Sequence, residues 1–146
     1  KTFTISAKKG ATFTVGSYKY KITGSSAVSF AGLKNSKTTK VTIPKTVKIG
    51  GKSFQVTSIA DKALKNMKVT SVKIGENVTV IGKEAFQNCK KLGTITIQSV
   101  KLKKVGKNAF KGIKTTAKIK VPSKKLTAYK KLLKGKGQGK KVQIKK

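Results

Sequence analysis

The feature that most constrains the fold of this chain is a phrase that occurs twice. The hexapeptide IGKEAF at residues 81–86 is followed 24 residues later by VGKNAF at residues 105–110. The apolar positions keep their character between the two copies, whereas Glu84 is replaced by Asn108. Self-similarity at a spacing of about 20 to 50 residues is the sequence signature of stacked repeats.

Four segments carry a short strand pattern in which two apolar residues flank one polar residue, as is typical of a half-buried strand. They start 31, 23 and 24 positions apart and are Val41-Thr42-Ile43, Val72-Lys73-Ile74, Ile95-Thr96-Ile97 and Ile119-Lys120-Val121. In three units a second apolar pair follows: Val56/Ile59, Val78/Ile81 and Leu102/Val105. A short helix-like turn comes next, at Ala63-Leu64, Ala85-Phe86 and Ala109-Phe110, and the units close on Met67, Cys89 and Ile113.

A single unit of this kind has an apolar edge that nothing covers. Stacking several units joins these edges into one core and pairs each strand with the next in a parallel sheet. Positions that face the stack must stay apolar and similar in size, while positions that face water are free to become Lys. We therefore predict that residues 39–146 form a repeat solenoid that is mainly β with short helices.

The N-terminal part departs from the repeat and predicts a cap. Residues 1–38 show alternating apolar positions punctuated by glycines, which indicates a small antiparallel β cap. The apolar positions are Phe3/Ile5, Phe13/Val15, Tyr18/Tyr20/Ile22 and Val28/Phe30. Gly50-Gly51, within Lys48–Phe54, predicts a hairpin inserted between this cap and the first complete unit.

The C-terminal part, from about residue 114, predicts a helical cap on the same structural domain. Ser123 would cap a helix whose apolar residues are spaced three and four apart, at Leu126, Tyr129, Leu132 and Leu133. Gly135 would end this helix, and Val142-Gln143-Ile144 would add a last strand. The run Lys134–Lys141 lacks the spacing of a phosphate-binding P-loop, so a flexible basic turn is expected there.

The repeated phrases resemble a known family. VTSIADKALKNM, VTVIGKEAFQNC and KVGKNAFKGI, with Ile43-Pro44 and Val121-Pro122 after strands, look like BspA-type leucine-rich repeats. The closing phrase IKVPSKKLTAYKKLLKGKG is similar to the terminal unit of many such domains in surface proteins of gut-dwelling Gram-positive bacteria. The resemblance covers about residues 39–145, and the chain departs from the type in its lysine enrichment and in having only about three repeats.

This resemblance implies a right-handed leucine-rich-repeat superhelix with a parallel sheet. It also implies an extracellular location, either secreted or cell-wall associated, and a role in adhesion or protein binding. The family motif contains no catalytic residues, so the resemblance implies none in this chain.

The charge of the chain limits its partners. The 146 residues include 36 Lys, no Arg and three acids, Asp61, Glu76 and Glu84, for a net charge of +33. Such a surface attracts polyanions through its long-range field. Lys is a hydrated point charge that lacks the planar fork with which Arg reads base edges, so we expect no sequence-specific nucleic-acid recognition.

Two further features of the sequence bear on location. No apolar run approaches the roughly 18 residues that a membrane-spanning helix needs, and no membrane span is expected. The chain starts at Lys1 without an initiator Met or a signal peptide. We interpret it as an excised or processed piece of a longer protein.

The residues that could act in catalysis or bind a metal, Cys89 and the three acids, are expected to have structural roles. Cys89 has no His anywhere in the chain to act as its base, and it aligns with apolar Met67 and Ile113, so we expect it to be buried. A single Cys also excludes an internal disulfide and a cysteine-based zinc site. The three acids do not share a register and are expected to be exposed and ion-paired, against the alternatives of an acid/base pair or a metal site. We therefore predict no catalytic residue, metal ligand or cofactor.

The open face of the predicted sheet is the candidate binding surface. Neighbouring side chains on a strand point to opposite faces, so residues that alternate with the buried ones point outward. These outward residues, here named the sheet ladder, are Lys40, Thr42, Ser71, Lys73, Thr94, Thr96, Lys118 and Lys120. The alternative is an ordinary solvated face on which Thr is simply a good strand former.

The leading hypothesis is a non-enzymatic extracellular binding or adhesion module, expected to be a monomer. Its lysines would contact an anionic cell-wall polymer, such as teichoic acid phosphates, or an acidic glycan. The alternative is a module for one specific partner, such as a host or bacterial surface protein, with the lysines mainly keeping the surface soluble.

Overall fold

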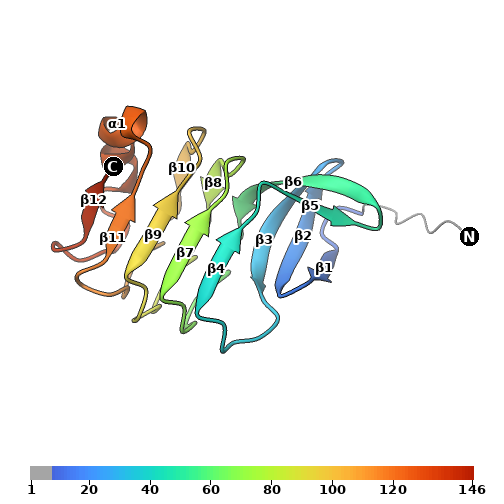
Figure 1. Ribbon diagram of the computed structural model, residues 1–146, viewed down its shortest axis with the longest axis horizontal. Coiled ribbons are helices and arrows are strands. Elements are labelled where there is room, and N and C mark those ends of the chain that lie inside the picture. Colours follow the sequence, from blue (N-terminus) through green and yellow to red (C-terminus); the bar gives the residue numbers. More distant parts are fainter. Residues whose placement is uncertain (1–7) are drawn as a thin grey trace, which may run out of the picture.

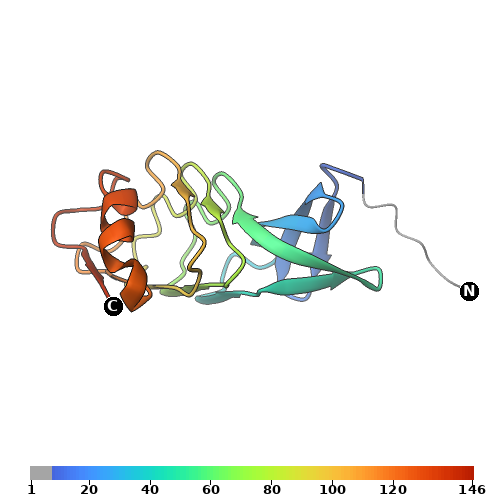
Figure 2. The same ribbon diagram turned by 90° about the horizontal axis from the view of Figure 1, so that it is seen from above.

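Successive coils of the chain contribute strands to two sheets that extend along the long axis of the molecule (Figure 1). The structure is a computed structural model that describes residues 8–146, so the predicted apolar positions Phe3 and Ile5 lie outside the described residues. Seen from above, the coils stand side by side, with the N-terminal strands at one end and a helix at the other (Figure 2). The predicted repeat solenoid with a parallel sheet is confirmed.

The first sheet has five strands, all parallel, in the order β12-β11-β9-β7-β4. Their bounds are β4 Lys40–Ile43, β7 Ser71–Ile74, β9 Thr94–Ile97, β11 Lys118–Lys120 and β12 Gln143–Lys145. The strict alternation of polar and apolar residues places one row of side chains in the core and the other outside. Val41, Val72, Ile95 and Ile119 occupy matching places in neighbouring strands, and all four are buried.

The second sheet has seven strands, in the order β1-β2-β3-β6-β8-β10, with β5 paired to β6. Their bounds are β1 Thr12–Val15, β2 Tyr18–Gly24, β3 Ala27–Leu33, β5 Thr46–Ile49, β6 Lys52–Ile59, β8 Val80–Ile81 and β10 Lys104–Val105. β6 contains the predicted pair Val56/Ile59, whereas β8 and β10 contain only the second members of their pairs, Ile81 and Val105.

The N-terminal strands form the antiparallel cap that the sequence predicts. β1, β2 and β3 are antiparallel neighbours, and β3 then runs parallel to β6, which joins the cap to the solenoid. The predicted hairpin connects β5 to β6. Gly50 and Gly51 have φ of 59° and 81°, the left-handed values that a two-residue hairpin turn requires.

The helix-like segments of the repeats are successive hydrogen-bonded turns and not helices. In each, the N–H of Ala63, Ala85 or Ala109 donates to the carbonyl three residues earlier. Positive φ at positions such as Glu84 (56°) and Asn88 (61°) interrupts any helical path. The chain bonds to the next coil instead, so these segments stack in register.

Because the turns stack on one another, the two copies of the repeated phrase lie at equivalent positions in adjacent coils. The N–H of Phe86 donates to the carbonyl of Ala109 at 2.8 Å. The rings of Phe86 and Phe110 are both fully buried, with centroids 5.5 Å apart and planes inclined by 8°. Matching residues of adjacent coils therefore occupy matching places, as the sequence predicts.

The C-terminal cap has the predicted helix with a different start. A 3-10 helix, η1, spans Ser123–Lys125, and α1 spans Leu126–Leu133 with Tyr129 and Leu133 buried. Ser123 is not a capping residue, because Pro122 precedes η1 and places Ser123 inside it, and no side-chain hydrogen bond caps either helix. Gly135 follows the helix with φ of 72°, as expected, and the last strand lies one residue later than predicted.

The basic glycine-rich run after α1 has a packing role that the sequence did not predict. The carbonyl of Lys136 accepts a hydrogen bond from the N–H of Phe110 at 3.0 Å, which repeats the bond between Phe86 and Ala109 one coil earlier. A Cβ at Gly137 would lie only 2.7 to 2.9 Å from Lys111 atoms. The run thus closes the last coil at its turn side.

Candidate functional site

The sheet ladder forms two straight rows across the five-stranded sheet. Register aligns Lys40, Ser71, Thr94 and Lys118 in one row and Thr42, Lys73, Thr96 and Lys120 in the other. The same register adds Gln143 and Lys145 of β12, which the prediction did not include. Neighbouring strands in a sheet are about 4.8 Å apart, so each row presents one polar side chain per step of this size.

The second row alternates hydroxyl and ammonium groups, whereas the first has two hydroxyl groups between two lysines. The four lysines and Thr42 are exposed, and Ser71, Thr94 and Thr96 are half-buried. The first strand is held to the cap, because the N–H of Thr42 donates to the hydroxyl of Tyr18 at 2.9 Å. The structure brings all eight predicted residues together on one face, and their role in binding stays a prediction.

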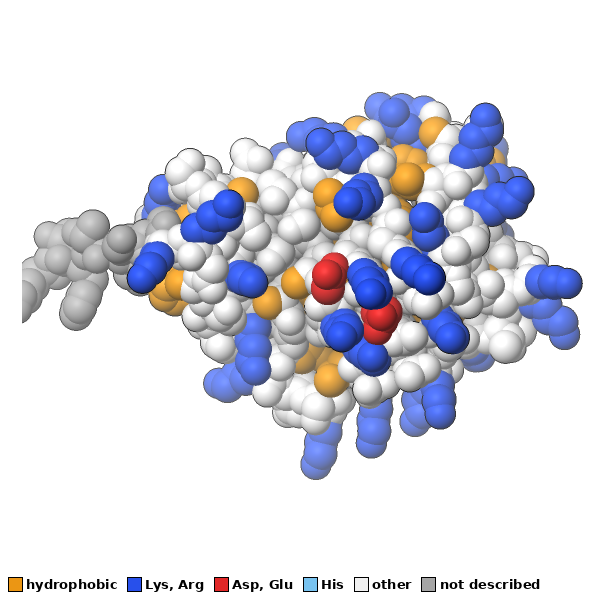
Figure 3. All heavy atoms as spheres, turned by 180° about the vertical axis from the view of Figure 1, so that it is seen from behind, with side chains coloured by type: hydrophobic (Ala, Val, Ile, Leu, Met, Phe, Trp, Pro, Cys, Tyr) orange, Lys and Arg blue, Asp and Glu red, His pale blue; other side chains and the backbone are white. Residues whose placement is uncertain are grey.

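Lysine also covers the face opposite this sheet, where few acidic side chains are visible (Figure 3). Within residues 8–146, ion pairs join Glu84 to Lys65 at 3.1 Å and to Lys83 at 4.0 Å, and Glu76 to Lys45 at 3.6 Å. The hydrogen bond from Lys65 lowers the pKa of the Glu84 carboxyl, so this group is charged at neutral pH. Two acids therefore neutralise only their immediate neighbours.

The acids have structural partners that differ in part from the prediction. Glu76 is exposed and ion-paired as expected, but Glu84 is half-buried. Asp61 accepts a hydrogen bond from the backbone N–H of Lys83, in the next coil, at 2.8 Å. In the part of the chain that the structure describes, no three His, Cys, Asp or Glu residues converge as metal ligands would.

Cys89 occupies the buried apolar position that its alignment with Met67 and Ile113 predicts. Its side chain is fully buried, and the thiol lies 2.9 Å from the carbonyl oxygen of Leu64, to which it donates. Burial raises the pKa of the Cys89 thiol to about 11, so the group is a neutral thiol at physiological pH.

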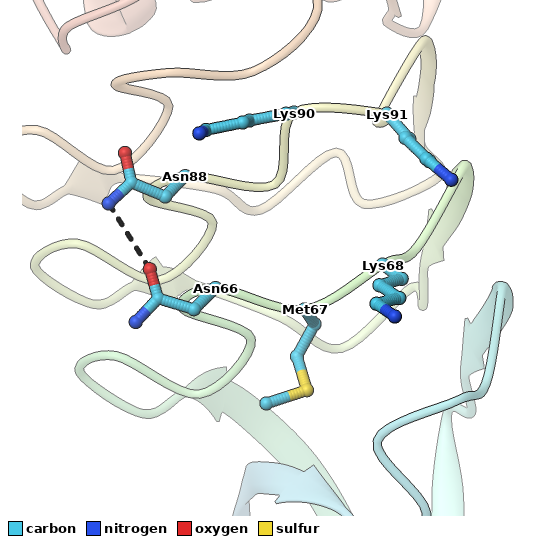
Figure 4. Close-up of a pocket in the computed structure, with 6 residues that line it drawn as sticks. All are labelled: Asn66, Met67, Lys68, Asn88, Lys90 and Lys91. Atoms are coloured by element: carbon cyan, nitrogen blue, oxygen red, sulfur yellow. Dashed lines mark hydrogen bonds between the residues drawn. The ribbon is translucent and has the colours of Figure 1, made fainter.

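A second polar feature, which the sequence interpretation missed, lies between the turns and the five-stranded sheet. The amide of Asn88 donates to the Oδ1 atom of Asn66 in the preceding coil at 3.1 Å. The two residues flank a hollow that Met67, Lys68, Lys90 and Lys91 also line (Figure 4). The signal in the sequence was the recurrence of Asn at the same place in two successive repeats.

The family of the chain follows from these repeats. The profile of the BspA type leucine rich repeat region (6 copies) matches residues 57–146. Because this match covers more than half of the chain, the protein belongs to the BspA-type leucine-rich repeat family. No curated protein is significantly similar in sequence.

Several solved structures share the fold. A leucine rich cell surface protein from Faecalibacterium prausnitzii A2-165 is 26% identical with a TM-score of 0.64, over 81% of this chain and 38% of that one. A leucine-rich repeat protein from Bacteroides ovatus is 28% identical with a TM-score of 0.60, over 75% and 35% of the two chains. One from Bacteroides capillosus, at 22% identity and a TM-score of 0.68, matches over 91% and 97% and shows the fold alone.

The present chain thus spans little more than a third of the length of the F. prausnitzii protein. None of the helices in residues 8–146 is both long enough and apolar enough to cross a membrane.

Proposed function

We propose that this domain is a non-enzymatic extracellular binding module that contacts anionic polymers through its lysines. The candidate ligands are phosphate-bearing cell-wall polymers and acidic glycans. The observation that carries the proposal is the presentation of lysines in register on stacked coils, with few acids to neutralise them. A flexible polyanion laid along such a surface would meet several ammonium groups at once.

The small number of lysines that form ion pairs with acidic side chains in the described residues supports this proposal. Within the described chain, the ion pairs use only Lys45, Lys65 and Lys83, out of 36 lysines in the sequence. The other lysines produce an electrostatic field that is the sum over many groups, and salt at 0.15 M screens this field over about 8 Å. Each exposed pair with a ligand contributes little, so affinity would come from multivalency.

The roles of the reactive residues support a non-enzymatic function. A nucleophilic Cys must be accessible and ionised, whereas Cys89 is buried with a raised pKa. Asp61 and Glu84 hold adjacent coils together through a backbone N–H and through Lys65. These side chains stabilise the stack and converge on no shared site.

The extracellular part of the proposal draws on a structural relative. The F. prausnitzii protein is a cell surface protein. A similar placement would expose this domain to wall polymers and to glycans outside the cell.

The proposal is tested by co-sedimentation of the protein with purified teichoic acid-bearing wall and with neutral dextran, at 50 mM and 500 mM NaCl. We expect binding to the wall at low salt, loss of binding at high salt, and none to dextran. Binding to the wall that ignores ionic strength would contradict the proposal.

A matched pair of variants tests the sheet ladder in the same assay. K73Q/K118Q/K120Q removes three ladder lysines, and K19Q/K124Q/K130Q removes three exposed lysines elsewhere, so both lower the charge equally. The ladder variant should lose more binding than its control. If instead Lys73→Ala or Thr96→Ala abolishes binding to one protein while the control is unaffected, the domain is a module for that partner.

A further inference from the structure

The loops that lead into the five-stranded sheet lengthen from one repeat to the next. Each loop begins after the unit-closing residue and ends at a fully buried anchor, which is Val69, Leu92 or Ala117 in turn. The loops are Lys68, then Lys90-Lys91, then Lys114-Thr115-Thr116. Because the anchors are fixed in the stack, the extra residues must extend outward, and every loop places at least one lysine there.

These loops border two neighbouring hollows with volumes of about 350 and 600 Å³. Lys90 and Lys91 line both, so the two hollows adjoin each other across successive coils. We name the two hollows together the edge groove and define it by Met67, Lys68, Lys90, Lys91, Thr94 and Lys114.

The positive charge of the edge groove is not neutralised by ion pairs within the described residues. All four of its lysines are exposed, and none takes part in the ion pairs of the described residues. Among residues 8–146, no acidic residue lines either hollow. Lys68 and Lys91 extend on one side of the first hollow, and Lys90 extends toward Asn88 on the other (Figure 4).

The floor of the edge groove suits a hydroxyl-rich ligand. Thr70, Ser71 and Thr94 supply hydroxyl groups, and Gly93 leaves the backbone uncovered by a side chain. Half-buried Met67 offers an apolar surface against which the C–H face of a sugar ring can pack. The hydrogen bond between Asn88 and Asn66 fixes the wall beside it.

We propose that the edge groove binds a linear acidic polysaccharide that carries a carboxylate on each sugar and lies along the solenoid axis. This inference rests on the proposed function and narrows its ligand. Neighbouring strands are about 4.8 Å apart, so a chain laid along the solenoid axis meets the lysines of successive coils in turn. A polyphosphate would use the ammonium groups and the hydroxyls but would leave Met67 without an apolar partner.

The test measures affinity by biolayer interferometry for immobilised polygalacturonate, inorganic polyphosphate and dextran at 0.15 M NaCl. The edge-groove variant is K68Q/K90Q/K91Q/K114Q. Its control is K19Q/K48Q/K124Q/K130Q, which removes four exposed lysines elsewhere and has the same net charge. Circular dichroism of both variants checks that the fold is retained.

We expect the wild-type protein to bind polygalacturonate and not dextran. The edge-groove variant should bind polygalacturonate about sixteenfold more weakly, since each of four exposed pairs contributes a roughly twofold effect. The control should change by about twofold or less.

The outcomes separate this inference from the proposed function. Equal losses in the two lysine variants, or tighter binding to polyphosphate than to polygalacturonate, would overturn the edge groove as a polysaccharide site and leave the broader function standing. If the wild-type protein binds neither polyanion, the proposed function fails as well.

Discussion

Substitution of Gly106 by Ala tests the close stacking of the coils. A Cβ at Gly106 would lie 2.4 Å from the backbone nitrogen of Lys83, 2.5 Å from its Cα atom and 2.7 Å from the carbonyl carbon of Gly82. All three atoms belong to the backbone of the preceding coil, so no side-chain rotation can relieve the overlap. The φ of Gly106 is not positive, and the prediction therefore concerns packing alone.

The expected cost follows from the displacement that Ala would require. Ordinary van der Waals contact begins near 3.4 Å, so the coils must separate locally by about 1 Å. The N–H of Gly106 donates to the carbonyl of Ile81 at 2.8 Å, and this bond would be lost. Overpacking costs about 1 to 3 kcal/mol and the hydrogen bond about 1 kcal/mol, so we expect a loss of about 3 kcal/mol.

The assay is urea and thermal unfolding followed by circular dichroism. At about 2 to 4 °C per kcal/mol for a chain of this size, Tm should fall by about 6 to 12 °C. Gly139→Ala is the control, because a Cβ at Gly139 meets nothing within 4 Å, and it should change stability by less than about 0.5 kcal/mol. A Gly106→Ala protein as stable as this control would refute the stacking argument.

Three more substitutions or treatments have defined outcomes. Phe86→Ala removes a fully buried ring and should cost about 3 to 5 kcal/mol in urea unfolding, and a cost below about 1 kcal/mol would contradict the ring stack. The Tyr129 hydroxyl donates to the Ser99 carbonyl at 2.7 Å and accepts from the Leu102 N–H at 3.1 Å. Tyr129→Phe leaves both groups without this partner, so we expect a loss of about 2 to 4 kcal/mol, and an unchanged urea midpoint would be evidence against the role of this hydroxyl.

Cys89 should be unreactive toward a thiol reagent in the folded protein at pH 8, and rapid labelling would show that it is accessible. Its pKa is raised from 9.0 to about 11 on folding, so the unfolded chain releases this proton first and the thiol's contribution to stability falls between about pH 9 and 11. The stability difference between wild type and Cys89→Ala should shrink over that window.

Much of the architecture was predictable because a repeated pattern indicates both the type of each element and its neighbour in the stack. Alternation such as Val72-Lys73-Ile74 indicates a strand, and recurrence of the same pattern at a regular spacing indicates which strand lies beside it. The same logic predicted the burial of Cys89 from its aligned neighbours. Gly50-Gly51 predicted its hairpin from local backbone preference alone.

Other features depend on tertiary contacts that leave no local signal. The carbonyl of Lys136 accepts a hydrogen bond from the last coil because the chain returns to that coil after α1. The apolar periodicity of the sequence does not predict this return. Ser123 is a residue type that often caps helices, but Pro122 takes the cap position and the helical segment starts at Ser123 itself. The edge groove arises from differences in loop length, whereas the repeat pattern reports only what the units share.

The salt dependence of binding to an anionic polymer tests the central claim most directly. Calorimetric titration of the protein with polygalacturonate between 50 and 500 mM NaCl would give the affinity at each salt concentration. Multivalent lysine contact predicts that the logarithm of the affinity falls steadily as the logarithm of the salt concentration rises, because bound counterions are released. An affinity that stays constant over this range, or equal binding to dextran, would contradict it.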